Sequence, residues 1–208
     1  MELPRIPVSR RTGDELFVSH GLGQQVHLLE FWQWYASDLV SNATRGILAE
    51  FIVAMALGEH HGVRLEWDSF DIETSTGIRI EVKSAAYVQS WHQHDYSRLQ
   101  FSVRPTRLWS AETRAYCKQQ RRQADIYVFA LLHHKDQTTI NPLDLSQWTF
   151  YVLATELLNQ QLSEAKSLSL KRLESLNPVQ CDFDGLYRAV HQVHAACSTA
   201  SSSSSSFS

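Results

Sequence analysis

The chain has 208 residues, of which 43% are apolar, 11% aromatic and 20% charged. This composition predicts a globular chain with a substantial core, and it excludes disorder throughout because ample apolar surface is available for burial. The apolar runs fall short of the ~20 residues that a membrane span requires, and a net charge of −3 argues against a generic nucleic-acid binder.

The spacing of apolar residues and turn signals predicts alternating helices and strands. Helices are expected at residues 24–39, between a cap at Ser41 or Asn42 and a stop at Gly58, and at residues 110–122, 155–161 and 184–194. Strands are expected at residues 63–67, 99–103, 124–132 and 148–153, with a hairpin over residues 70–83. This order predicts an α/β fold with a central mixed sheet flanked by helices.

The domain organisation follows from composition. Residues 1–197 are predicted to form a single domain, and the serine-rich residues 198–208 are predicted to be disordered. No apolar stretch follows the start of the chain, so we expect no secretory signal. The three cysteines are widely spaced and predict no disulfide framework, which favours a reducing, cytoplasmic location.

The hairpin at residues 70–83 places two carboxylates opposite each other. A three-residue loop at residues 75–77 pairs Ile72 with Ile80 and sorts apolar and polar side chains onto separate faces. In this register Asp71 faces Glu81, an arrangement that destabilises a hairpin unless a cation joins the pair. Lys83 lies two residues farther on the same face. Two carboxylates and a lysine around one point are typical of metal-assisted phosphodiester hydrolysis.

Glu50 is a third acidic candidate. It lies on or beside the apolar stripe of the second predicted helix, where a carboxylate is costly unless it is paired or binds a metal ion. The alternative is a boundary glutamate whose carboxylate reaches water.

The pattern of Glu50 in a helix, Asp71 on a strand and Glu81-Val82-Lys83 on the next strand resembles the PD-(D/E)XK nucleases. The resemblance covers residues 43–132 and implies a restriction-endonuclease-like core. It further implies that Asp71, Glu81 and the Val82 carbonyl bind Mg²⁺, with Mn²⁺ able to substitute. By the same resemblance, Glu50 supports the metal and Lys83 serves the attacking water.

Three points of the resemblance remain open. Phe70 stands where the name of the motif has proline, and many members of the superfamily lack that proline. Asp68 is a rival for Asp71, although it lies outside the derived register. The glutamine that follows the lysine in several subgroups is either Gln89 or Gln100.

A basic segment interrupts the acidic chain. Residues 98–122 hold seven Lys or Arg and one Asp or Glu, which indicates a local anion-binding site. The predicted helix at residues 110–122 would align four of these bases in one stripe: Arg114, Lys118, Arg121 and Arg122. Arg98, Arg104 and Arg107 precede it. Such a stripe would position DNA phosphates, and the alternative is a solvated helix face.

These features predict a magnesium-dependent endonuclease that hydrolyses DNA, of restriction, repair or defence type. One alternative is a catalytically inactive protein that keeps the nuclease fold for nucleic-acid binding or assembly. Another is an α/β interaction protein whose acidic hairpin is merely solvated. Convergence of Glu50, Asp71, Glu81 and Lys83 in the folded chain would favour the enzyme. A homodimer would suit cutting of both strands.

Overall fold

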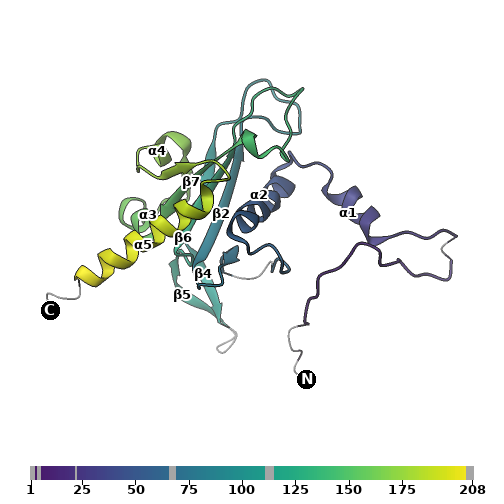
Figure 1. Ribbon diagram of the computed structural model, residues 1–208, viewed down its shortest axis with the longest axis horizontal. Coiled ribbons are helices and arrows are strands. Elements are labelled where there is room, and N and C mark those ends of the chain that lie inside the picture. The colour runs from purple at the N-terminus through teal and green to yellow at the C-terminus, as the bar shows by residue number, and fades with distance from the viewer. Residues whose placement is uncertain (1–2, 4–5, 22, 66–68, 111–114, 205–208) are drawn as a thin grey trace.

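The computed structural model describes residues 3, 6–21, 23–65, 69–110 and 115–204. Its centre is a five-stranded sheet in the order β1 (Ile72–Glu73), β2 (Arg79–Ala86), β6 (Ile126–Leu132), β7 (Trp148–Ala154) and β9 (Val179–Cys181). β2 and β6 are parallel, and the other neighbouring strands are antiparallel. The predicted α/β class with a central mixed sheet is therefore confirmed (Figure 1).

Helices and short strands cover both faces of this sheet. On one face, α2 (Asn42–Leu57) and α5 (Leu186–Ser204) pack against β2, β6 and β7. The other face is covered by β3 (Gln100–Ser102), α3 (Thr155–Gln161), β8 (Ser167–Ser169) and α4 (Leu170–Glu174). All seven residues of β6 are buried, which explains the continuous apolar run in its sequence.

Local capping explains where α2 begins and ends. The Ser41 side chain accepts a hydrogen bond from the Thr44 amide, and Gly58 ends the helix in a left-handed conformation at φ 78°. Both ends agree with the prediction. Helix α1 (Leu28–Ala36) is shorter than the predicted residues 24–39, and the 3-10 helix η1 (Leu145–Gln147) precedes β7.

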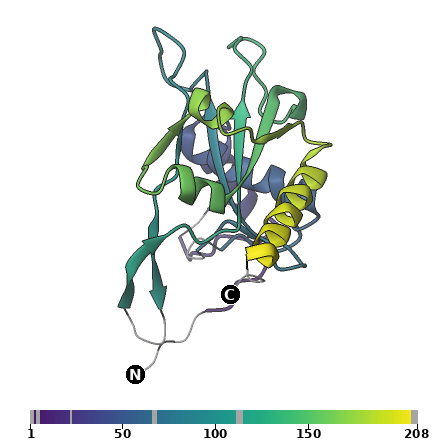
Figure 2. The same ribbon diagram turned by 90° about the vertical axis from the view of Figure 1, so that its left-hand side faces the viewer.

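The predicted helix at residues 110–122 is wrong. In its place β4 (Thr106–Ser110) and β5 (Ala115–Arg121) form an antiparallel ribbon that projects from the body (Figure 2). Pairing between the two strands, such as that of Arg107 with Gln120, stabilises a ribbon instead of a helix. The helical spacing of the basic residues does not predict this pairing. A strand was also predicted at residues 63–67. Residues 63–65, the part of it that the structure describes, form no strand.

The carboxyl-terminal helix extends farther than its sequence suggests. α5 continues to Ser204, into the segment that was expected to be disordered, and residues 205–208 lie outside the described residues. Of the helices in the described ranges, none combines the length and apolar character needed to cross a bilayer.

Candidate active site

The hairpin of β1 and β2 has the predicted register. Ile72 pairs with Ile80 and Glu73 with Arg79, and Gly77 adopts φ 83° in the turn between them. The turn is closed by the Gly77 amide, which donates to the Thr74 carbonyl at 2.8 Å. This register places Asp71 opposite Glu81, at the edge of the central sheet.

Asp71 is fixed against β2 by two hydrogen bonds. Its amide donates to the Ile80 carbonyl at 3.0 Å, and its Oδ2 accepts from the Val82 amide at 2.7 Å. Burial and the charge of Glu81 raise the pKa of the Asp71 carboxyl, while Lys83, the Val82 hydrogen bond and Arg64 act in the opposite direction. The two carboxylates therefore repel each other in a partly desolvated position.

Lys83 lies beside this pair of acids. Its Nζ is 2.5 Å from Glu81 Oε1, and both side chains are only partly exposed. On the neighbouring strand β6, Tyr127 pairs with Glu81 and Phe129 pairs with Lys83. Because these two rings are buried, the sheet supplies a rigid apolar backing for the charged groups. Asp71, Glu81 and Lys83 thus converge as predicted.

Glu50 does not join them as a third acid. Arg64 binds its carboxylate in a bidentate ion pair, with Nε on Oε2 and Nη2 3.1 Å from Oε1. Among the residues that the structure describes, no three His, Cys, Asp or Glu side chains are grouped so that they could hold a metal ion. Arg64 is the site residue that sequence reasoning missed, because a partner fourteen positions away in an irregular segment leaves no periodic signal.

Glu50 and Asp71 nevertheless line the same cavity. It has a volume of about 360 Å³ and lies between α2 and β1, with Arg64 on its wall. Most of its remaining lining is apolar, including Ile47, Phe51, Val63, Leu65 and Phe70. The rival acid Asp68 lies outside the described residues.

The donor set of this site fits a divalent cation with two carboxylates rather than three. Asp71 and Glu81 are hard oxygen donors, and burial, followed by the charge of Glu81, raises the pKa of Asp71. A cation between the two carboxylates would offset both effects. The Val82 carbonyl follows directly in the same strand and is available as a further oxygen donor. Glu50 would reach such an ion only after leaving Arg64.

The two candidate glutamines differ in their surroundings. Gln89 is buried, accepts from Arg45 Nη1 at 3.0 Å and donates to the Ala86 carbonyl at 2.9 Å, so it belongs to the packing beyond β2. Gln100 is exposed on β3, where it pairs with Ser169 of β8. These contacts give Gln89 a structural role.

The basic segment is divided among different roles. Arg122 was predicted to contact nucleic acid, but it is buried and donates to the Val103 and Leu162 carbonyls and to Asn159 Oδ1. Burial lowers the pKa of this guanidinium. Arg122 therefore ties the root of the ribbon to the body, and its assignment to nucleic acid is corrected.

Three other predicted contact residues remain at the surface. Arg98, Arg104 and Arg121 are exposed, and the backbone of Lys118 lies in β5. Arg114 lies outside the described residues. Arg121 shares a polar cavity of about 380 Å³ with Arg79, which precedes Glu81 by two residues in β2. In this cavity Arg79 is bound by Asp125, whose Oδ1 lies 2.6 Å from Arg79 Nη2.

The site residues fall within a region shared with a known protein family. Residues 25–172 match the family model described as bacteriophage T4 endonuclease IV. This match covers Asp71, Glu81, Lys83 and the whole ribbon. Among curated proteins, none matches the chain.

Proposed function

The chain belongs to the bacteriophage T4 endonuclease IV family, and from this membership we propose that it hydrolyses DNA phosphodiester bonds with the aid of Mg²⁺ or Mn²⁺. The observation that carries the proposal is the convergence of Asp71, Glu81 and Lys83 on one antiparallel hairpin. This arrangement supports a site of the PD-(D/E)XK type. The proposal covers enzymes of restriction, repair or defence type alike.

The acidic pair would hold the cation. Asp71 and Glu81 supply carboxylate oxygens from two adjacent strands, and the Val82 carbonyl adds a third oxygen donor. When bound, a divalent cation withdraws charge from the phosphate that is being cleaved. The hydrogen bond from the Val82 amide keeps Asp71 Oδ2 in place, so that the carboxylate does not turn away when the substrate arrives.

Lys83 would act on the substrate side of this pair. Its ammonium already lies against Glu81 Oε1, and it would orient the attacking water and stabilise negative charge that develops on the phosphate. The buried rings of Tyr127 and Phe129 fix the strand behind it. Loss of Lys83 would therefore impair hydrolysis without removing an oxygen ligand of the metal.

Exposed basic side chains would position the DNA. Arg104 and Arg121 flank the ribbon, whose sequence adds Arg107 and Lys118, and the exposed Arg98 precedes β3. Contacts of this kind neutralise phosphates without reading bases. We place the protein in the cytoplasm, because its three cysteines are widely spaced in the sequence and predict no disulfide framework.

One observation favours the alternative of an inactive nuclease-fold protein that binds or assembles on nucleic acid. The Glu50 carboxylate is held by Arg64 instead of facing Asp71 and Glu81. A binding protein would keep the exposed arginines and the fold but would show no turnover. The two candidates therefore differ in a direct cleavage measurement.

The proposal is tested by cleavage of supercoiled plasmid and of single-stranded circular DNA with Mg²⁺ or Mn²⁺. Conversion of circles to linear forms would identify an endonuclease. Asp71→Asn and Glu81→Gln are expected to lose activity by about 10²- to 10³-fold, because each removes a carboxylate that would hold the charge-stabilising cation. Glu164→Gln, an exposed change outside the site, serves as the matched control. DNA binding without cleavage by the wild type would favour the alternative.

A further inference from the structure

An amino-terminal arm, residues 6–21 and 23–36, projects beside α2 with the exposed helix α1 at its base (Figure 1). Two stretches of the arm lie side by side, because Leu16 forms a β-bridge with His27 and the Phe17 amide donates to the Val26 carbonyl at 2.9 Å. The Leu28 amide donates to the Glu15 carbonyl at 2.8 Å. The arm is therefore a folded unit.

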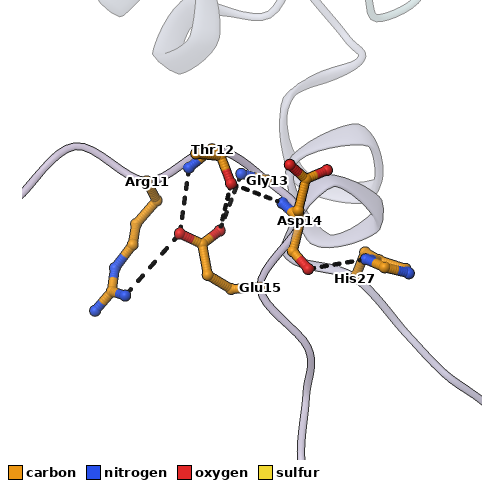
Figure 3. A network of polar contacts seen from close by, with 6 residues as sticks. All are labelled: Arg11, Thr12, Gly13, Asp14, Glu15 and His27. Atoms are coloured by element: carbon orange, nitrogen blue, oxygen red, sulfur yellow. Dashed lines mark hydrogen bonds and ion pairs between the residues drawn. The ribbon is translucent and has the colours of Figure 1, made fainter.

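Contacts within the arm fix its shape (Figure 3). The Glu15 carboxylate accepts from the amides of Thr12 at 3.2 Å and Gly13 at 3.0 Å. The ring nitrogen Nδ1 of His27 lies 3.0 Å from the Asp14 carbonyl oxygen. Gly13, at φ 98°, lies so close to the Trp32 ring that an added Cβ would approach it to 3.1 Å. The turn at Gly13 is thus built to receive an aromatic side chain of α1.

This ordered unit leaves a large apolar surface in water. All nine residues of α1 belong to the described part of the chain, and none of them is buried. Its exposed apolar side chains include Leu29, Phe31 and Trp32, with Trp34 83% and Tyr35 54% accessible. Apolar clusters of this kind on a soluble protein mark interaction sites.

A second exposed apolar surface lies on the body of the molecule. Ile47 and Phe51 of α2 and the neighbouring Val63 and Leu65 are exposed and line the cavity of about 360 Å³ described above. We call these four residues and that cavity the α2 groove. Asp71 is on its wall, so an occupant of the groove would border the candidate active site.

Residues 37–41 join α1 to α2, and α1 lies to the side of α2 (Figure 1). Asp38 Oδ1 accepts from the Val40 amide at 3.2 Å and the Ser41 amide at 3.0 Å. The buried Arg45 donates from Nη1 to the Val40 carbonyl at 2.7 Å. At the other end of the arm, Arg10 Nη1 donates to the His61 carbonyl at 3.3 Å. Both ends of the arm are thus held against the body, and α1 stays exposed.

We propose that the α2 groove receives α1 of a second copy of this chain, and that the exchange is reciprocal. Each exposed ring of α1 offers on the order of 100 Å², so two helices in two grooves would bury a total of about 1,500 Å². That area is typical of a stable dimer. A two-fold exchange also buries both apolar surfaces of each chain at once. It gives a closed dimer that adds no further copies.

The partner's helix would also complete the candidate active site, a step that rests on the proposed function. A helix in the α2 groove would cover the Asp71 side of the acidic pair, whereas Glu81 and Lys83 do not line that groove and stay partly exposed. Exclusion of water from one side strengthens the interactions of a charged site. The second copy would therefore raise cleavage as well as stability.

The mass of the protein in solution tests the interface without reference to cleavage. Sedimentation velocity at tens of micromolar should give the wild type twice the chain mass of 23.8 kDa. Trp34→Glu on the arm and Phe51→Glu in the groove should each give the single-chain mass, with dimerisation weakened at least tenfold. Tyr187→Glu, an equally drastic change at an exposed residue of α5, is the matched control and should remain dimeric. Circular dichroism establishes that each variant is folded.

A mixing experiment tests the exchange. Trp34→Glu keeps its acidic pair but lacks a competent arm, and Asp71→Asn keeps its arm but lacks the acidic pair. Their mixture should cleave DNA at least tenfold faster than either variant alone. Absence of recovery when the wild type itself cleaves DNA, a monomeric wild type, or dimeric Trp34→Glu and Phe51→Glu variants would each overturn the exchange. A dimeric wild type that cleaves no DNA would overturn the proposed function alone.

Discussion

The two hairpins of the molecule, β1–β2 and β4–β5, use their side chains in opposite ways. The first lies at the edge of the central sheet, where β6 and α2 bury its apolar face and hold Asp71, Glu81 and Lys83 in fixed positions. The second leaves the body, and the exposed Arg121 stands at its root. Catalytic groups must be held at fixed distances, whereas side chains that contact phosphates need a positive charge and an extended position. The comparison thus separates where DNA would be cut from where it would be held.

The largest expected difference between the two hairpins is in stability. Ile80→Ala should lower the free energy of unfolding by about 3 kcal/mol, because Ile80 is fully buried between β1 and β6. Gln120→Ala on the exposed face of the ribbon should change it by less than about 0.5 kcal/mol. Urea unfolding curves measure both changes. Similar losses would mean that the ribbon is part of the cooperative core.

A smaller effect should separate two adjacent arginines at the root of the ribbon. Arg122→Ala should destabilise the fold by about 2 kcal/mol, because it leaves the carbonyls of Val103 and Leu162 without their buried donor. Arg121→Ala should leave stability nearly unchanged and should weaken DNA binding. The slope of binding against salt concentration should become shallower by about 0.9 if one phosphate contact is lost. An unchanged slope would assign Arg121 to solvent.

These two arginines also show where sequence patterns stop being informative. Alternation of buried and polar residues determines the register of β1–β2, so Asp71, Glu81 and Lys83 could be placed together before the fold was known. In residues 106–121 the basic residues fitted a helical stripe equally well, because the cross-strand pairing of β4 and β5 leaves no local signal in the sequence. The burial of Arg122 depends on Asn159 and Leu162, about forty residues away.

The same limit applies to the partner of Glu50 and to the arm. A helical glutamate beside an apolar stripe needs a partner, and this need could be inferred from local spacing. That the partner is Arg64 depends on the path of an irregular segment. Similarly, the aromatic residues of α1 could be recognised as a helix, but packing of Trp32 against Gly13 joins positions that no helical or strand period connects.

The smallest predicted effect concerns pH. Folding raises the pKa of Asp71 above its ordinary value near 3.8. At a pH between 3.8 and this raised pKa, the folded chain therefore binds more protons than the unfolded chain. Stability contributed by this group is therefore present below pH 3.8 and lost as the pH rises through the folded pKa. Asp71→Asn should remove this dependence and melt at or above the wild type at neutral pH. A wild type that gains stability from ionisation of Asp71 would contradict the repulsion between the acids.

Calorimetry with and without Mg²⁺ tests most directly whether the β1–β2 hairpin holds a metal-dependent site. A cation that binds only the folded state raises the melting temperature by mass action. We expect Mg²⁺ to stabilise the wild type and Lys83→Ala, which retains both carboxylates, and to leave Asp71→Asn unchanged. An equal response of the wild type and Asp71→Asn to Mg²⁺ would contradict the assignment of Asp71 to the metal site.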